Sequence, residues 1–113
     1  MSAITTHVLD IASGRPAAGV PVVLRVRDGE AWRELGRGVT DADGRLRTLL
    51  PDGAPVEAGT YNIVFDTGAY FELTGTAGFY PEVAVSFTLR EPGGHYHVPL
   101  LLSPFGYSTY RGS

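Results

Sequence analysis

The sequence of 113 residues contains no cysteine and no lysine. Without cysteine, the chain can form neither a disulfide bond nor a thiolate metal site, which fits a reducing cytosol. All nine basic residues are arginine, which we attribute to genomic base composition and which favours a bacterial source. The net charge of −3 is small, and the charged residues are scattered along the chain. The basic stripe that nucleic-acid binding requires is therefore missing, and no nucleic-acid partner is expected.

Long apolar runs are also missing, so no segment of the chain is expected to cross a bilayer and no membrane partner is expected. No basic segment followed by an apolar run precedes the strand-like pattern that begins at Ile4, so we expect no secretory signal and a cytoplasmic protein. Hydrophobic residues make up 43% of the chain, which excludes disorder as its main state. The length fits a single domain, residues 1–113, with one core.

Frequent glycine and proline interrupt short segments in which apolar and polar residues alternate. The chain has 15 glycines and 8 prolines, and period-two alternation occupies residues 20–27, 61–65 and 82–90. A less regular strand is expected from Trp32 to Thr40. Residues 69–73 could form one or two helical turns closed by Gly75. This pattern predicts an all-β fold, an antiparallel β-sandwich of seven or eight strands with one short helix.

The dipeptide Asp43-Gly44 lies between the strand that ends at Thr40 and the alternating segment that begins at Arg45. Such a dipeptide is typical of a hairpin turn. The preceding acidic residue, Asp41, makes the segment resemble the start of a calcium loop. The downstream glutamate and the third acidic position of such a loop are missing, so a turn is the favoured interpretation.

Histidine is scarce, and its three copies lie at the two ends of the chain, at His7, His95 and His97. Strand periodicity places His97 opposite an apolar face that belongs in the core, so His97 is expected to point outward. His7 lies outward with Leu9 by the same argument. The outer surface would then be unusually apolar for solvent, which suggests an interface or a groove. Its expected apolar members are Leu9, Pro99, Leu101 and Tyr107.

A metal site is a competing interpretation of these histidines. His95 and His97 have a spacing that puts two ligands on one strand face. A third ligand would have to come from His7 or from a carboxylate, and the sequence offers no clear one. We therefore expect no metal and no other cofactor.

Four motifs in the expected order carry a resemblance to a known family. They are Thr6-His7-Val8-Leu9-Asp10 followed by Gly14-Arg15-Pro16-Ala17, then Asp43-Gly44-Arg45, then Phe79-Tyr80-Pro81, and last the segment from His95 to Ser113. Together they resemble the signatures of transthyretin-like proteins. The terminal Tyr110-Arg111-Gly112-Ser113 resembles the 5-hydroxyisourate hydrolase branch of that family and not its hormone carriers.

The resemblance implies two facing four-stranded sheets and a homotetramer, a dimer of dimers with active sites in a central channel. It implies hydrolysis of the small molecule 5-hydroxyisourate to 2-oxo-4-hydroxy-4-carboxy-5-ureidoimidazoline, without a cofactor. The residues that match the family's catalytic set are His7, Arg45 and His97. The expected substrate-binding residues are Ser108, Tyr110, Arg111, Gly112 and Ser113, where Ser108 is added because it shares strand parity with Tyr110.

Two alternatives stay open at this point. A carrier of a small aromatic ligand would have the same fold, although the carrier-type site lacks the histidine and arginine set. Within the hydrolase interpretation, either His7 or His97 could act as the base, because a neutral imidazole suits both. Arg47 and His95 are lesser candidates for the site.

Overall fold

A computed structural model describes residues 2–113; Met1, which belongs to the expected domain 1–113, lies outside the described residues. Within residues 2–113 the backbone forms nine strands and one helix. In chain order they are β1 Ile4–Asp10, β2 Arg15–Pro16, β3 Pro21–Asp28, β4 Ala31–Val39, β5 Arg45–Leu46, β6 Gly59–Phe65, α1 Thr67–Thr74, β7 Val83–Leu89, β8 Tyr96–Ser103 and β9 Gly106–Thr109. β2 and β5 have only two residues each. Without them, seven longer strands remain, which agrees with the predicted seven or eight.

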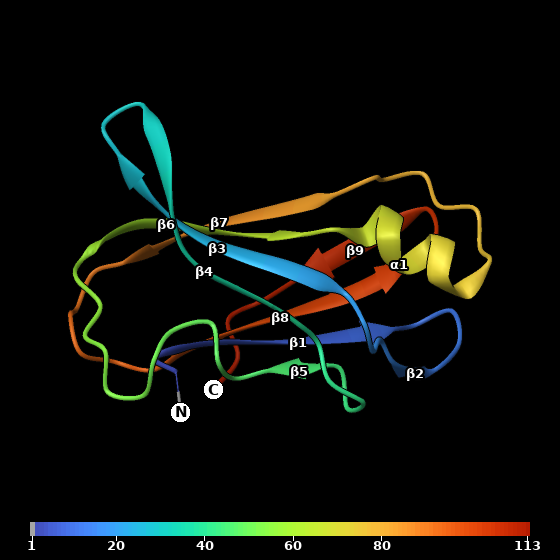
Figure 1. Cartoon of the computed structure of the whole chain (residues 1–113), viewed down its shortest axis with the longest axis horizontal. Coiled ribbons are helices and arrows are strands. Elements are labelled where there is room, and N and C mark those ends of the chain that lie inside the picture. The colour runs from blue at the N-terminus through green and yellow to red at the C-terminus, as the bar shows by residue number, and fades with distance from the viewer. Residues whose placement is uncertain (1) are drawn as a thin grey trace.

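The strands form two layers, which confirms the predicted sandwich (Figure 1). One sheet has the order β2-β1-β8-β9, with β5 paired to β1 beside β2, and the other has the order β4-β3-β6-β7. The first sheet thus has five strands where the resemblance implied four. The core between the layers includes Leu24, Ile63, Phe65, Leu100 and Leu102, all buried. Burial of each such side chain contributes roughly 1.5–3 kcal/mol, so the inward-facing residues fix which face of each strand points outward.

The pairing of β1 with β8 is parallel, whereas the sequence analysis predicted a wholly antiparallel sandwich. The register places Thr5 opposite His97 and His7 opposite Pro99. The prediction failed here because alternation reveals which residues face the core and not the direction of the neighbouring strand. The parallel pairing brings the first strand of the chain beside its last long one.

The turn at residues 41–45 is present, but it does not close a hairpin. The Asp41 carboxylate accepts hydrogen bonds from the backbone N–H groups of Asp43 and Arg45, at 2.9 and 3.0 Å, and Gly44 adopts φ +74°. The strands on either side belong to different sheets, because β4 pairs with β3 whereas β5 pairs with β1. The predicted hairpin is therefore wrong. The turn carries the chain across the sandwich, and pairing with β1 then places Leu46 in the core.

The predicted helix is confirmed as α1, and Gly75 ends it in the left-handed conformation at φ +67°. The Asp66 carboxylate caps the first turn by accepting from the N–H of Ala69 at 3.0 Å. The Tyr70 hydroxyl donates to Asp10 at 2.8 Å, which ties the helix to the end of β1. Among the described residues, no helix has the length and apolarity needed to span a membrane.

Gly44 and Gly53 offer a matched test of the crossing turn. Both have a positive φ, but an added Cβ at Gly44 would lie 2.4 Å from the carbonyl oxygen of Val8, whereas one at Gly53 would meet no atom within 4 Å. Left-handed backbone costs a residue other than glycine about 1–2 kcal/mol. We expect Gly53→Ala to lower the free energy of unfolding by about that amount, and Gly44→Ala to lower it by at least twice as much because β1 must also shift. Urea denaturation measures both; equal losses would show that the contact with Val8 does not constrain the turn.

Candidate active site

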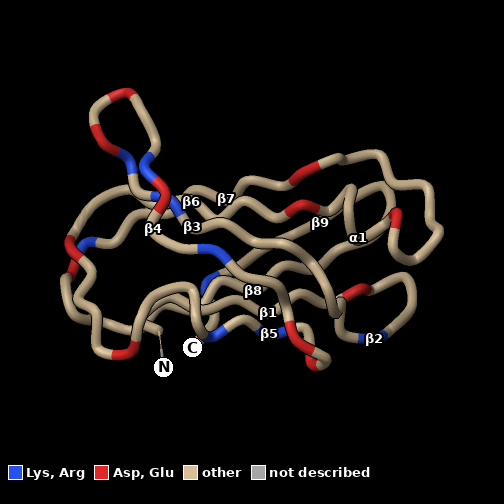
Figure 2. The backbone as a smooth tube through the Cα atoms, viewed as in Figure 1, with Lys and Arg blue, Asp and Glu red and all other residues tan. Residues whose placement is uncertain are grey.

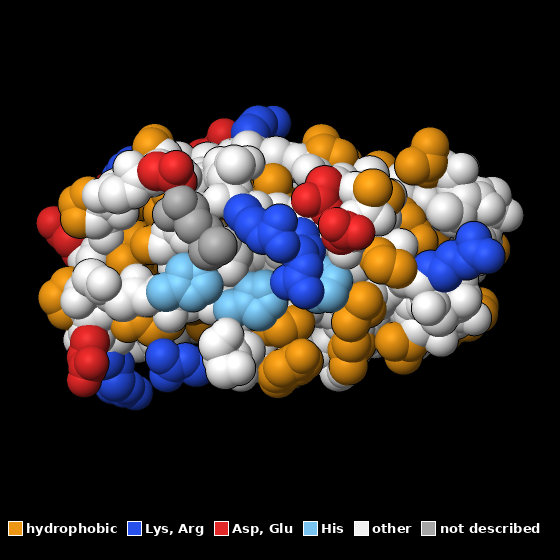
Figure 3. Space-filling model, turned by 90° about the horizontal axis from the view of Figure 1, so that it is seen from below, with side chains coloured by type: hydrophobic (Ala, Val, Ile, Leu, Met, Phe, Trp, Pro, Cys, Tyr) orange, Lys and Arg blue, Asp and Glu red, His pale blue; other side chains and the backbone are white. Residues whose placement is uncertain are grey.

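Residues from both ends of the chain meet on the outer face of the five-stranded sheet. His7 on β1 lies between Arg45 on β5 and Pro99 on β8, and Thr5 lies beside His97. The face seen in Figure 3 shows the histidine side chains in a row, with arginine side chains packed against them. The outward direction predicted for His7 and His97 is therefore correct, since Val8, Val98 and Leu100 fill the core on the other side of the sheet.

The chain end extends this arrangement by one more strand. Leu101 pairs with Ser108 in the β8–β9 ladder, and the same register continues to an isolated bridge between His97 and Gly112. The Gly112 N–H donates to the carbonyl oxygen of His97 at 2.8 Å. A Cβ at Gly112 would lie only 2.6 Å from Cδ2 of His97, so glycine is required for this close approach. Ser108 on β9 and Gly112 beyond its end thus lie on the chain segment that borders β8, and Tyr110 lies between them.

His7 makes a hydrogen bond that defines its tautomer. Its Nε2 lies 3.0 Å from the backbone carbonyl oxygen of Asp43, in the crossing turn. A carbonyl oxygen only accepts hydrogen bonds, so Nε2 carries the hydrogen and donates it. When neutral, His7 therefore has its lone pair on Nδ1.

Thr5 belongs to the site although the sequence analysis did not select it. Its Oγ1 lies 2.8 Å from Nδ1 of His97 and 3.5 Å from Nε2 of His95, and the residue is only 3% exposed. Strand parity was the signal that could have found it, because Thr5 lies two residues before His7 and shares its face. Through Thr5, His95 is also connected to His97.

Both candidate bases are held in the neutral state. The pKa of His97 is lowered from its usual value, first by burial and then by the positive charge of Arg45, with smaller effects from His7, His95 and Arg47. The pKa of His7 is lowered by burial and by Arg45, and the hydrogen bond to Asp43 opposes this shift in part. Since an unperturbed histidine titrates near pH 6.5, both imidazoles are uncharged at neutral pH and can accept a proton.

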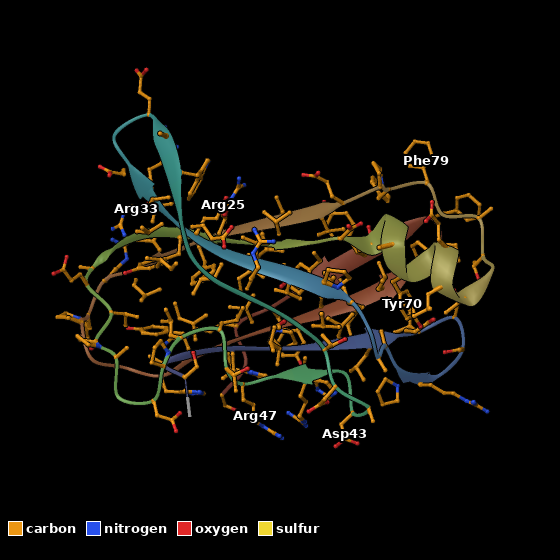
Figure 4. The ribbon with its side chains drawn as sticks, viewed as in Figure 1. Arg25, Arg33, Asp43, Arg47, Tyr70 and Phe79 are labelled. Carbon is orange, nitrogen blue, oxygen red and sulfur yellow. The ribbon has the colours of Figure 1, made fainter. Side chains whose placement is uncertain are left out.

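Two arginines supply the positive charge beside these imidazoles. Arg45, in β5, is half-buried, and Arg47, just beyond β5, is exposed. Figure 2 shows basic residues along β5, and in Figure 4 the Arg47 side chain points away from the sandwich. Arg47 was a lesser candidate, yet it lowers the pKa of both His7 and His97 and so takes part in the electrostatics of the site.

The chain is similar to known proteins over nearly its whole length. The model of the HIUase/Transthyretin family matches residues 4–112. The 5-hydroxyisourate hydrolase of Salmonella dublin is 47% identical over 110 residues, covering 97% of this chain and 80% of the relative.

The chain belongs to the HIUase/Transthyretin family.

Solved structures from both branches of the family resemble the fold. The 5-hydroxyisourate hydrolase of Klebsiella pneumoniae matches with a TM-score of 0.85 and 42% identity, and each chain is covered completely. Sea bream transthyretin in complex with thyroxine matches with a TM-score of 0.87 and 33% identity, covering 96% of this chain and 93% of the other. The backbone fold is therefore common to both branches, and the side chains of the site must distinguish them.

Two aromatic or charged residues near the chain end lie elsewhere than the outer face. Tyr107 pairs with Leu102, a core residue, and its ring contacts Tyr80 at 5.2 Å, so its expected place beside Leu9 and Leu101 is wrong. Arg111 packs over the ring of Tyr96, with its guanidinium carbon 5.1 Å from the ring centre. A pocket of about 230 Å³ lies between β7 and β9, and Arg111, Tyr110 and His97 are among the residues that line it. Ser113 is exposed.

A metal site at His95 and His97 would need a third ligand close to them. Within residues 2–113, no three side chains of histidine, aspartate or glutamate form a group that could hold a metal ion. The third ligand that His95 and His97 would need is therefore not supplied by His7 or by a carboxylate of the described chain.

The lowered pKa values of the histidines lead to a test with Arg45→Gln. In the wild-type protein we expect His7 and His97 to titrate below pH 6.5, so that protonation appears only as the pH falls past that value. Removal of the Arg45 charge should raise both pKa values and move the titrations to higher pH. Histidine NMR titration measures the shift. Arg37→Gln, on β4 of the opposite sheet, is the control, and an equal shift in both variants would contradict a local effect of Arg45.

Proposed function

We propose that this protein is a 5-hydroxyisourate hydrolase that opens a ring of its substrate to give 2-oxo-4-hydroxy-4-carboxy-5-ureidoimidazoline. The observation that carries the proposal is the meeting of two neutral imidazoles and a guanidinium on one sheet face. The relatives named above with this activity, which match nearly the whole chain, support the same conclusion.

The proposed catalytic residues are His7, His97 and Arg45. One neutral imidazole takes a proton from water as the water oxygen attacks a ring carbonyl carbon. Arg45 donates to the carbonyl oxygen, whose negative charge grows in the transition state; loss of one such donor typically costs about 10²–10³ in kcat. The ring C–N bond then breaks, and the imidazolium formed in the first step supplies the proton that the leaving nitrogen needs. The other imidazole orients the water or the substrate by a hydrogen bond. No step requires a resident cofactor.

The chain end supplies the proposed substrate-binding residues. Ser108 and Tyr110 border the outer face next to Leu101 and Pro99, and Gly112 lets the chain approach His97. Tyr110 is a bulky wall that would close the site to larger aromatic molecules. Arg111 and Ser113 complete the proposed set; Arg111 packs over Tyr96 and lines the same pocket as His97.

The assembly that we propose is a cytoplasmic homotetramer, a dimer of dimers, built on one domain of residues 1–113. The outer face carries Leu9, Pro99 and Leu101 in register beside the histidines. Symmetric packing of two such faces would bury these apolar side chains and enclose the site.

A carrier of a small aromatic ligand is the second candidate, because the fold also matches the sea bream protein in complex with thyroxine. A carrier has no need of two imidazoles kept neutral beside an arginine, so the site favours hydrolysis. The experiment below separates the two functions, since a carrier would bind the substrate without accelerating its decay.

The proposed activity is tested by following the ultraviolet absorbance of freshly generated 5-hydroxyisourate. We expect the protein to accelerate the decay, and His97→Asn to lower kcat by about 10²–10⁴ with unchanged circular dichroism, because an acid–base group is lost. His7→Asn should have a similar effect. Decay at the spontaneous rate with the wild-type protein would exclude the hydrolase, and near-native turnover by His97→Asn would remove His97 from the catalytic residues.

The closing role of Tyr110 is tested by Tyr110→Thr, with Tyr107→Thr as a matched control on the other side of the same segment. We expect Tyr110→Thr to lower kcat/KM about tenfold, the order of effect of changing one wall of a small-molecule pocket. Tyr107→Thr should lower the melting temperature, since it loses the contact with Tyr80, and leave kcat/KM within about twofold. Equal kinetics for both variants would contradict the assignment of Tyr110.

A further inference from the structure

The Thr5 hydroxyl is the most buried polar group on the outer face of β1. The residue is 3% exposed, whereas its neighbours on that face, His7 and Leu9, are only partly buried. A buried hydroxyl that makes no hydrogen bond is costly, so the single hydrogen of Thr5 must reach an acceptor. The nearest ring nitrogen is Nδ1 of His97 at 2.8 Å, and Nε2 of His95 is 3.5 Å away.

These two distances indicate the direction of the hydrogen bonds. A separation of 2.8 Å is usual for a hydroxyl donor, whereas 3.5 Å lies at the outer limit of a direct hydrogen bond. Donation toward His95 would leave the Thr5 hydrogen in the poorer bond. Donation toward Nδ1 of His97 gives the Thr5 hydrogen a good acceptor. It also leaves the lone pairs of the Thr5 oxygen free to accept from an N–H of His95. The Nδ1 atom of His97 is then an acceptor, and its Nε2 carries the hydrogen.

The His97 ring is held on two sides. Nδ1 faces Thr5, and Cδ2 lies against the backbone of Gly112. The edge that remains for a substrate is formed by Nε2 and Cε1. A ring held in this way presents an N–H to the outer face.

His7 has the complementary arrangement. Its Nε2 donates to the carbonyl oxygen of Asp43, so its lone pair is on Nδ1. The two imidazoles therefore differ in protonation although both are neutral: His7 has a free lone pair, and His97 has a free N–H.

We propose that Thr5 is a positioning residue that holds His97 as the Nε2–H tautomer, which makes His97 a hydrogen-bond donor to the substrate and His7 the base. This inference rests on the proposed hydrolase function. His7 Nδ1 takes a proton from the attacking water, and the imidazolium formed there gives that proton to the nitrogen released from the ring. His97 Nε2–H donates a hydrogen bond to the substrate during the step. His7 is neutral again once it has given up this proton, and His97 keeps its own proton throughout, so the pair returns to its starting state after each turnover.

The tautomer is tested without substrate, by ¹⁵N NMR of histidine-labelled protein at about pH 8, where both rings are neutral. We expect the wild-type spectrum to show His97 protonated on Nε2 alone. Thr5→Val keeps the shape of the side chain but removes the hydroxyl, so a population protonated on Nδ1 should appear. Thr5→Ser should restore the wild-type spectrum. A wild-type His97 protonated on Nδ1, or an unchanged tautomer in Thr5→Val, would overturn the proposal.

Kinetics provide the second measurement. We expect Thr5→Val to lower kcat about tenfold with KM within about twofold, less than the loss of an acid–base group would cost. Thr6→Val is the matched control, since Thr6 is equally buried and its hydroxyl donates to the carbonyl oxygen of Val98 on the core side, at 2.6 Å. It should lower the melting temperature without changing the tautomer or kcat. An equal fall in kcat for both variants would mean that Thr5 acts only through stability.

Failure of this proposal and failure of the proposed function give different results. If the wild-type protein does not accelerate substrate decay, the hydrolase function is lost even when the tautomer is as expected. If the decay is accelerated but Thr5→Val retains full kcat and the wild-type tautomer, the function stands and the role of Thr5 is lost.

Discussion

The parallel pairing of β1 with β8 is the constraint on which the site depends. It joins Thr5 to His97 across 92 positions of sequence, and β5 on the other side of β1 adds Arg45. Because side chains alternate between faces, a slip of one residue in this register would turn the histidines toward the core. The large apolar side chains of β1 and β8, such as Ile4, Val8 and Leu100, prevent that slip by filling the space between the sheets. Core packing therefore fixes the geometry of the outer face.

Arg45 links the electrostatics of the resting site to those of the reaction. Its charge and the burial of the rings both disfavour protonated histidine, so they act in the same direction on His7 and His97. In the proposed reaction, the same guanidinium would stabilise the negative charge that develops on the attacked carbonyl. Asp41, the nearby carboxylate, is occupied by the backbone N–H groups of the crossing turn, and these hydrogen bonds lower its pKa. The turn thus fixes the backbone at Arg45, and the Asp41 carboxylate opposes the effect of Arg45 on the pKa of His7 only in part.

Local signals in the sequence predicted local structure well. The alternation around His97 and the glycine at position 75 correctly indicated an outward-facing histidine and the end of α1. The predictions that were wrong or missing concern which strands pair and which side chains lie against each other. The Asp43-Gly44 turn was read as a hairpin because a turn signal does not specify which strand the chain joins next. Tyr107 was assigned to the outer face, and Thr5 was overlooked, because their roles depend on contacts across strands.

The geometry of one chain also explains why catalysis and assembly are connected in the proposed function. Of the three proposed catalytic residues, only His97 lines the pocket of about 230 Å³, since His7 and Arg45 lie on β1 and β5 on the open sheet face. Electrostatic stabilisation by Arg45 is strongest where water is excluded, because the effective dielectric constant is then low. Packing of a second copy over Leu9 and Leu101 would exclude that water and bury apolar surface at the same time. The apolar character of the outer face and the demands of the chemistry thus both favour the proposed assembly, in which a contact between subunits would complete the site.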